Sequence, residues 1–168
     1  PEDCHVTNWA TQQMCRTIKR RNPDKPGFWY LSFTHPHPPL VPLHTYFDRY
    51  TRKTIPKPLV SNWSEKTLSH FLKNIKDRWP QMSTEMIDDV RRAFYALCTH
   101  IDAQIRIVIG TLREEKLLDN TIIMITSDHG DMLGDFGLFA KRVMYENSTR
   151  IPMIILGTKE NKKVNKGC

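Results

Sequence analysis

The residues best suited to chemistry lie together in Ser127-Asp128-His129-Gly130, which follows an apolar run rich in isoleucine. The run predicts a buried strand, and the polar residues predict a loop beyond its carboxyl end, where open α/β sheets bind ligands. Asp128 offers a carboxylate oxygen and His129 a neutral nitrogen, so the adjacent pair could bind one divalent cation. Lys141, at the end of this loop, adds a positive charge suited to an anion.

The same spacing also allows a plainer interpretation, in which Asp128 caps a turn and His129 only packs against its neighbours. A single Asp-His pair is a weak metal signal, so the residues alone leave both interpretations open.

A second candidate region is the proline-rich stretch Thr34-His35-Pro36-His37-Pro38-Pro39. Its prolines exclude a helix and a central strand, and they stiffen a loop that could hold an imidazole in place. Without further information, exposed loop histidines are the favoured interpretation of His35 and His37.

Length and charge narrow the possible functions. The chain has 168 residues, enough for one domain with a core, and a net charge of +7. The basic residues are scattered and no nucleic-acid-binding motif is present, so we expect an anionic small molecule rather than nucleic acid. No apolar run reaches the length of a membrane span and no signal peptide is visible, so we expect no membrane partner and the compartment stays unknown.

Helical and extended patterns alternate along the chain. We expect helices over about residues 9–21, from Ser64 to before Pro80, and over about 85–112, the first capped by Thr7 or Asn8. Strands are expected over 28–33 and 151–156 as well as before Asp128, and a long ordered loop over 41–59. Arg91 lies off the apolar stripe of the longest helix, on a solvated or loop-facing side. This alternation is typical of an α/β fold with a mostly parallel sheet.

Three segments resemble the sulfatase family, including arylsulfatases and choline-sulfatases, within the alkaline-phosphatase-like superfamily. They are residues 127–134 with 137–141, residues 144–152, and residues 32–39. The resemblance implies a three-layer sandwich with a mostly parallel sheet, of which the N-terminal half is missing. It implies a partial catalytic domain over 1–157, followed by a Lys-rich tail over 158–168.

The resemblance also assigns roles to the candidate residues. Asp128 and His129 match the late metal ligands, which usually hold Ca²⁺. Lys141 matches the lysine that contacts the sulfate, and His37 the histidine near the leaving group; His35 ranks behind His37 as a substrate-binding candidate. The family nucleophile, a formylglycine made in a Cys/Ser-x-Pro-x-Arg motif, has no counterpart in this sequence.

The expected activity is therefore hydrolysis of sulfate monoesters as part of a longer sulfatase, with the isolated chain inactive. Two alternatives stay open: a phosphonate or phosphate ester hydrolase of the same superfamily, and a non-catalytic remnant that binds an anion or a partner. Phe136 stands where many relatives have histidine in Gly-Asp-His-Gly, which bears on the substrate class.

Overall fold

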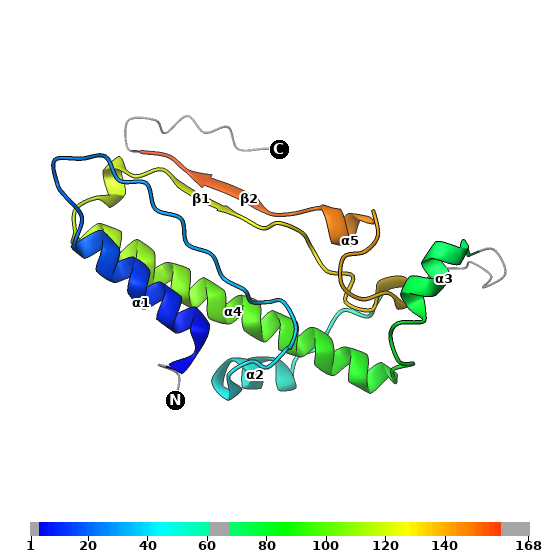
Figure 1. Cartoon of the computed structure of the whole chain (residues 1–168). Helices are drawn as coiled ribbons and strands as arrows, with labels where there is room; N and C mark the ends of the chain where they lie inside the picture. Colours follow the sequence, from blue (N-terminus) through cyan, green and yellow to red (C-terminus); the bar gives the residue numbers. More distant parts are fainter. Residues whose placement is uncertain (1–3, 61–67, 159–168) are drawn as a thin grey trace. The chain divides into compact units, whose positions relative to one another are not determined.

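The structure is a computed structural model that describes residues 4–60 and 68–158 (Figure 1). The chain divides into two compact units. The first consists of the described residues within Pro1–Lys53, Arg92–Ile122 and Leu156–Cys168, and the second of those within Thr54–Arg91 and Ile123–Ile155. Helix α4, Thr84–Glu114, begins in the second unit and ends in the first.

In the first unit, helix α1 (Val6–Lys19) packs along the C-terminal part of α4. Ile18 and Leu97 are fully buried, and Arg21 Nη1, just after α1, forms a 2.9 Å ion pair with Glu115 Oε2, just after α4. The predicted caps of α1 are wrong. His5 is the N-cap, and Asn8 lies inside the helix, where its Oδ1 is 2.5 Å from Nε2 of the buried His100.

The longest predicted helix is confirmed in α4. Its apolar positions recur at steps of three and four residues, and Ser83 caps its start by accepting a 3.2 Å hydrogen bond from the Met86 backbone N–H. A hydrogen bond at this position satisfies one of the backbone donors that every helix leaves free in its first turn. Among the described residues, no helix is both long and apolar enough to cross a membrane.

The second unit contains helix α3 (His70–Lys76) and the two strands β1 (Ile123–Thr126) and β2 (Met153–Leu156), which pair as a two-stranded sheet. Thr126 Oγ1 donates a 3.0 Å hydrogen bond to the Pro152 carbonyl, so the end of β1 lies beside the start of β2 and the strands run in opposite directions (Figure 1). The small core of this unit consists of Ile75, Met132, Leu138 and Val143.

The remaining elements are short. Helix α2 covers His44–Thr51, α5 covers Glu146–Thr149, and the 3-10 turns η3 and η4 cover Leu118–Asn120 and Asp135–Gly137. Helix α2 lies within residues 41–59, where the sequence predicts a loop. The prediction was wrong there because the prolines at both ends of the stretch disfavour a helix, while the residues between them can still form one.

Two further expectations differ from the structure. The predicted mostly parallel sheet is not seen in the described residues, where β1 and β2 pair in opposite directions; for a whole domain it stays a prediction. The predicted strand over residues 28–33 pairs with no other described strand, although its residues alternate between exposed and half-buried as an extended chain does.

Some predictions fall on residues outside the description. Ser64, the predicted start of a helix, is one of them; the described helix there is α3, capped by Ser69, whose Oγ accepts a 3.3 Å hydrogen bond from the Leu72 backbone N–H. Of the predicted tail over 158–168, residues 159–168 also lie outside, so the boundary at 157 stays a prediction.

Candidate functional site

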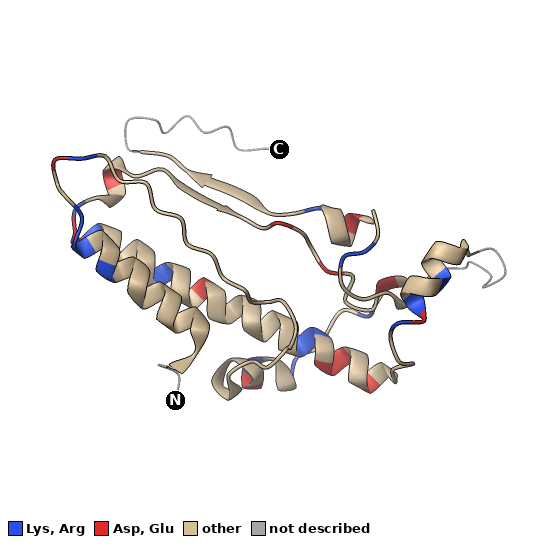
Figure 2. Ribbon diagram, viewed as in Figure 1, with Lys and Arg blue, Asp and Glu red and all other residues tan. Residues whose placement is uncertain are grey.

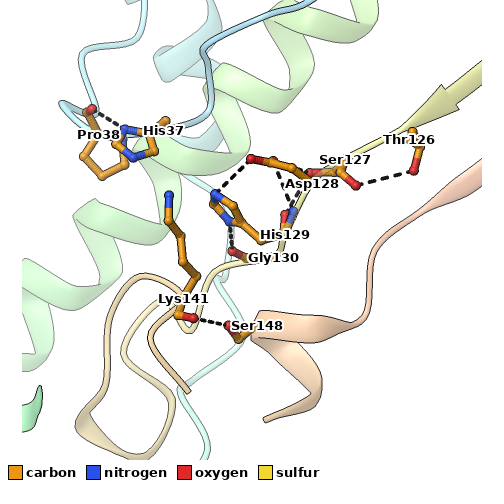
Figure 3. Close-up of polar contacts among 9 residues, drawn as sticks. All are labelled: His37, Pro38, Thr126, Ser127, Asp128, His129, Gly130, Lys141 and Ser148. Carbon is orange, nitrogen blue, oxygen red and sulfur yellow. Dashed lines mark hydrogen bonds and ion pairs between the residues drawn. The ribbon is translucent and has the colours of Figure 1, made fainter. Parts of the chain in front are cut away.

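The candidate site begins where β1 ends, at the turn formed by Ser127, Asp128, His129 and Gly130 (Figure 3). Ser127 Oγ donates a 2.7 Å hydrogen bond to the His129 carbonyl, which closes the turn. The Asp128 side chain is 86% exposed and the His129 side chain 26% exposed, and Oδ2 of the first lies 3.5 Å from Nε2 of the second. The two side chains therefore face each other, with the aspartate at the surface and the histidine partly buried.

A hydrogen bond fixes the protonation pattern of the His129 ring. Nδ1 lies 2.6 Å from the Gly130 carbonyl oxygen, and because a carbonyl can only accept, Nδ1 must carry the hydrogen. In the neutral ring the lone pair is then on Nε2, the atom that faces Asp128. Metal-binding histidines use this arrangement, in which one nitrogen donates to the protein and the other is left for the ion.

The surroundings of Asp128 favour its charged form. Partial desolvation raises the pKa of this carboxyl, but backbone hydrogen bonds from Asp128 and His129 and the charges of His129 and Lys141 outweigh it, and the net pKa is lowered. The carboxylate is thus ionised at neutral pH, as a cation ligand must be.

Lys141 is brought to this turn by the loop that leads to α5. Its side chain is exposed and points toward the His129 ring (Figure 3). Ser148 Oγ donates a 2.9 Å hydrogen bond to the Lys141 carbonyl, and the Ser148 carbonyl accepts a 2.8 Å bond from the Gly130 backbone N–H. One buried serine therefore joins the segment carrying Lys141 to the segment carrying Asp128 and His129.

Gly130 is required by this close approach. A Cβ atom at this position would lie 2.0 Å from the Asn147 carbonyl oxygen, far inside van der Waals contact. The glycine therefore allows the Asp128 turn and the start of α5 to pack backbone against backbone.

A buried ion pair between Arg91 and Asp135 holds the loop between Asp131 and Lys141 in place. Arg91 Nη1 lies 3.1 Å from Asp135 Oδ1 and also donates a 2.9 Å bond to the Leu133 carbonyl, with both charged side chains less than 10% exposed. Asp135 further accepts hydrogen bonds from the Leu59 backbone N–H, at 2.9 Å, and from the Asn147 side-chain amide. The solvated interpretation of Arg91 is wrong, and its loop-facing alternative is confirmed.

The loop between Asp131 and Lys141 contains several left-handed residues that are not glycine. Leu133, Phe136 and Ala140 have φ values of 47°, 57° and 61°, a conformation that disfavours residues with a Cβ atom. Asp131 Oδ1 holds the loop closed by accepting from the Leu133 and Ala140 backbone N–H groups, at 2.9 and 3.2 Å. The sequence analysis did not predict these two hydrogen bonds. Asp residues near a glycine are typical of turns, and Asp131 precedes Gly134 by three residues.

The two histidines of the proline-rich stretch belong to the first unit. His37 is exposed, and its Nδ1 lies 2.8 Å from the Pro38 carbonyl, so Nδ1 carries the hydrogen there as well. His35 is half-buried, with Nδ1 3.0 Å from Thr7 Oγ1 and its ring 4.9 Å from that of His5. Desolvation, and after it the proximity of His5, lowers the pKa of His35. That His37 meets the Asp128 turn stays a prediction.

The donor set at the turn is chemically suited to a divalent cation but incomplete. Asp128 Oδ2 and His129 Nε2 lie 3.5 Å apart, so one divalent cation could contact both atoms. Within residues 4–60 and 68–158, no group of three or more His, Cys, Asp or Glu side chains could hold a metal ion. The turn thus provides two ligands, and a full coordination shell needs others.

Comparison with known proteins adds the family. The sequence matches the Sulfatase family over residues 4–167. The chain belongs to the sulfatase family. It is 37% identical over 167 residues to an arylsulfatase of Clostridium perfringens, covering 99% of this chain and 35% of that protein. It is 31% identical to a choline-sulfatase of Rhizobium meliloti, covering 92% of this chain and 31% of the relative.

Solved structures agree with this assignment. A phosphonate monoester hydrolase from Silicibacter pomeroyi superposes with a TM-score of 0.80 at 26% identity, covering 94% of this chain and 33% of that one. The predicted membership in the sulfatase family of the alkaline-phosphatase-like superfamily is confirmed. The chain spans about a third of the length of the relatives it matches.

Proposed function

We propose that this sulfatase-family chain is part of an enzyme that hydrolyses sulfate monoesters. The observation that carries the proposal is the gathering of Asp128, His129 and Lys141 at the carboxyl end of β1. An ionised carboxylate, an imidazole with its lone pair on the exposed side, and an ammonium group at one turn suit a cation and an anion bound together.

In the proposed site, Asp128 and His129 would hold a divalent cation, and we assign it as Ca²⁺ because the carboxylate is a hard oxygen donor. Such an ion supplies Lewis-acid charge for the sulfate oxygens when bound. Lys141 would neutralise a further sulfate oxygen. His37 would donate a proton to the departing alcohol oxygen, and His35 would make a weaker contact with the substrate.

The chain by itself is proposed to be inactive. No Cys or Ser in the sequence lies in the Cys/Ser-x-Pro-x-Arg motif from which the formylglycine of sulfatases is made. The nucleophile and the missing metal ligands would come from the remaining two thirds of a sulfatase domain. We therefore expect no turnover of an aryl sulfate by the isolated chain, and turnover above background would contradict this part of the proposal.

The metal assignment can be tested on the chain alone. In a ¹⁵N-resolved NMR titration with Ca²⁺, we expect weak binding, with a Kd of about 1 mM or higher because only two ligands are present. Shift changes should concentrate at Asp128, His129 and Gly130. Asp128→Ala should abolish them, whereas the control Asp24→Ala, which removes an exposed carboxylate from a turn of the first unit, should not. Absent or scattered shift changes would favour a non-catalytic remnant.

A second candidate reaction, the hydrolysis of phosphonate or phosphate esters, is supported by the likeness to the phosphonate monoester hydrolase. Both ester classes present an anionic tetrahedral group, so Asp128, His129 and Lys141 would bind either. Turnover of matched aryl sulfate, phosphate and phosphonate esters by a complete domain containing this chain would decide. A kcat/KM higher for sulfate supports the first proposal, and a higher value for phosphonate supports the second.

A further inference from the structure

Ser148 is a buried polar residue in a short helix that is otherwise exposed. The other residues of α5 are exposed, whereas Ser148 is only 3% exposed. Burying a hydroxyl costs free energy unless it forms hydrogen bonds, so the partners of Ser148 indicate what the residue does. Those partners lie in the two segments that carry the proposed site.

The hydroxyl of Ser148 holds the backbone of Lys141. Ser148 Oγ donates a 2.9 Å hydrogen bond to the Lys141 carbonyl (Figure 3). On the other side of the lysine, Ala140 is in the left-handed conformation, and its backbone N–H donates a 3.2 Å bond to Asp131 Oδ1. The backbone of Lys141 is thus held on both sides, so its side chain starts from a fixed point and extends toward the His129 ring.

The main chain of Ser148 holds the turn that carries His129. The Ser148 carbonyl accepts a 2.8 Å hydrogen bond from the Gly130 backbone N–H, and the Gly130 carbonyl oxygen lies 2.6 Å from Nδ1 of His129. The Ser148 N–H donates a 2.9 Å bond to the Tyr145 carbonyl, which fixes Ser148 at the start of α5. One residue therefore contacts Lys141 through its side chain and reaches His129, by way of Gly130, through its main chain.

Exposed cations are frequent around α5. Lys141 and Arg142 precede this helix and Arg150 follows it, all of them exposed, and the chain on either side of α5 is blue in Figure 2. Charge alone therefore does not distinguish Lys141 from its basic neighbours. A lysine has a long and flexible side chain, so it binds an anion at a defined place only when its backbone is fixed. The hydrogen bond from Ser148 fixes it.

We propose that Ser148 is a positioning residue, which fixes Lys141 relative to the turn of Asp128 and His129 so that an anion held by the lysine meets a cation held by the turn. Ser148 contacts neither ion, because it acts through the Lys141 carbonyl and the Gly130 N–H. The inference rests on the proposed function, since it assigns Ser148 to the same site. The two contacts can be separated: Ser148→Ala removes the hydroxyl but keeps the carbonyl, so it should release Lys141 and leave the turn held.

Backbone order is the first measurement, and it needs no ligand. NMR relaxation gives the order parameters of the Gly130 amide and of the Arg142 amide, which shares its peptide group with the Lys141 carbonyl. In Ser148→Ala, the order parameter of Arg142 should fall from about 0.85, the value of rigid backbone, to about 0.6, while that of Gly130 stays near about 0.85. Thr149→Ala is the matched control, because it removes a hydroxyl of the same helix that donates only to the Tyr145 carbonyl, at 3.2 Å. It should leave both order parameters unchanged.

Binding of Mn²⁺ is the second measurement. This ion suits carboxylate ligands as Ca²⁺ does, and it is paramagnetic, so it broadens NMR signals more strongly the nearer they lie. Bound at Asp128 and His129, it should broaden the signals of the His129 ring and of the Lys141 side chain. Ser148→Ala should keep the broadening at His129 and reduce that at Lys141 about twofold or more, because a flexible backbone lets the ammonium group move away from the ion. Thr149→Ala should keep both.

The outcomes separate this inference from the proposed function. An unchanged order parameter at Arg142 in Ser148→Ala would overturn the inference, and so would unchanged broadening at Lys141 while Mn²⁺ still broadens His129. Equal losses in Ser148→Ala and Thr149→Ala would also overturn it, since the helix as a whole would then be responsible. If Mn²⁺ broadens no signal at the turn of the unsubstituted chain, the proposed metal site is refuted, and the order parameters alone decide whether Ser148 fixes Lys141. If Ser148→Ala does not fold, Ser148→Cys, whose thiol is a weaker donor, is measured in its place with the same criteria.

Discussion

Two pairs of polar side chains in the second unit have contrasting surroundings. Arg91 and Asp135 lie under the loop, less than 10% exposed, with the carboxylate accepting from three donors. Asp128 and His129 lie at the tip of the neighbouring turn, with the aspartate 86% exposed. The buried pair holds backbone segments together, whereas the exposed pair leaves its atoms accessible to something that binds.

The contrast follows from desolvation. A buried charge must be matched by fixed partners, since water no longer solvates it, and each of those partners ties down part of the chain. An exposed carboxylate keeps its water and can exchange that water for a cation. The predictions below test whether the buried pair shapes the loop while the exposed pair serves binding.

The largest effect is expected from breaking the buried pair. Asp135→Ala leaves Arg91 charged and unpaired in the interior, and it frees the Leu59 and Asn147 donors. Loss of one partner of a buried ion pair destabilises proteins by about 3–5 kcal/mol. Urea unfolding should therefore show a large fall in the free energy of unfolding.

The partly exposed pair between Lys57 and Asp88 provides the control for that experiment. Lys57 Nζ lies 2.8 Å from Asp88 Oδ2; the lysine side chain is 63% exposed and the aspartate side chain 15% exposed. Lys57→Ala should cost at most about 1 kcal/mol. Equal losses for Asp135→Ala and Lys57→Ala would refute the view that burial gives the Arg91–Asp135 pair its structural role.

A smaller effect is expected where the turn meets the start of α5. Gly130→Ala places a methyl group against the Asn147 carbonyl, so one of the two segments must move. Overpacking of this kind costs about 1–3 kcal/mol. Because Gly130 adjoins His129, NMR shifts of the His129 ring should change as well. Gly110→Ala is the control, since a Cβ there meets nothing within 4 Å. Because Gly110 lies inside α4, alanine should raise the free energy of unfolding by about 0.5–1 kcal/mol, and the ring shifts should stay near their original values.

The sequence predicted local features better than the contacts that support them. The long helix α4 followed from apolar spacing. Asp128, His129 and Lys141 were singled out from the polar loop after an apolar run and from the resemblance to sulfatases, and their roles stay predictions. The Arg91–Asp135 pair joins residues 44 positions apart, and no local pattern encodes such a contact.

The wrong predictions have a related cause. Residues 28–33 have the composition of a strand, but strand formation also requires a neighbour, which the described residues do not provide. The cap of α1 was missed because His5 is an uncommon cap, while Thr7 and Asn8, residues typical of caps, are used inside the helix for contacts such as the one to His100.

The pH dependence of stability provides a further test, through His35 in the first unit. The pKa of His35 is lowered by burial and by His5, so the folded state binds this proton less readily than the unfolded state. As the pH falls below about 6.5, the unfolded state takes up more protons and stability decreases. The melting temperature should fall between pH 7.5 and pH 5.5, and it should fall less in His35→Gln.

The rings of His5 and His100 lie 4.8 Å apart in the same cluster. The variant His35→Gln keeps both of them, so the difference between the two proteins isolates His35. Identical pH profiles would show that His35 does not govern the acid sensitivity of the first unit.

The smallest effect on stability is expected at the exposed pair itself. Asp128→Asn keeps the size of the side chain and an oxygen that can accept from the His129 backbone N–H, which now lies 3.1 Å from Oδ1. Because the aspartate is 86% exposed, the free energy of unfolding should change by no more than about 0.5 kcal/mol. The Ca²⁺-dependent NMR shifts at His129 should nevertheless weaken strongly, because an amide oxygen lacks the charge of a carboxylate. Asp128→Asn should therefore weaken Ca²⁺ binding without changing stability, whereas Asp135→Ala should lower the free energy of unfolding. If Asp128→Asn instead destabilises the chain as much as Asp135→Ala does, then Asp128 stabilises the folded turn, and the proposal that it serves to bind a cation is refuted.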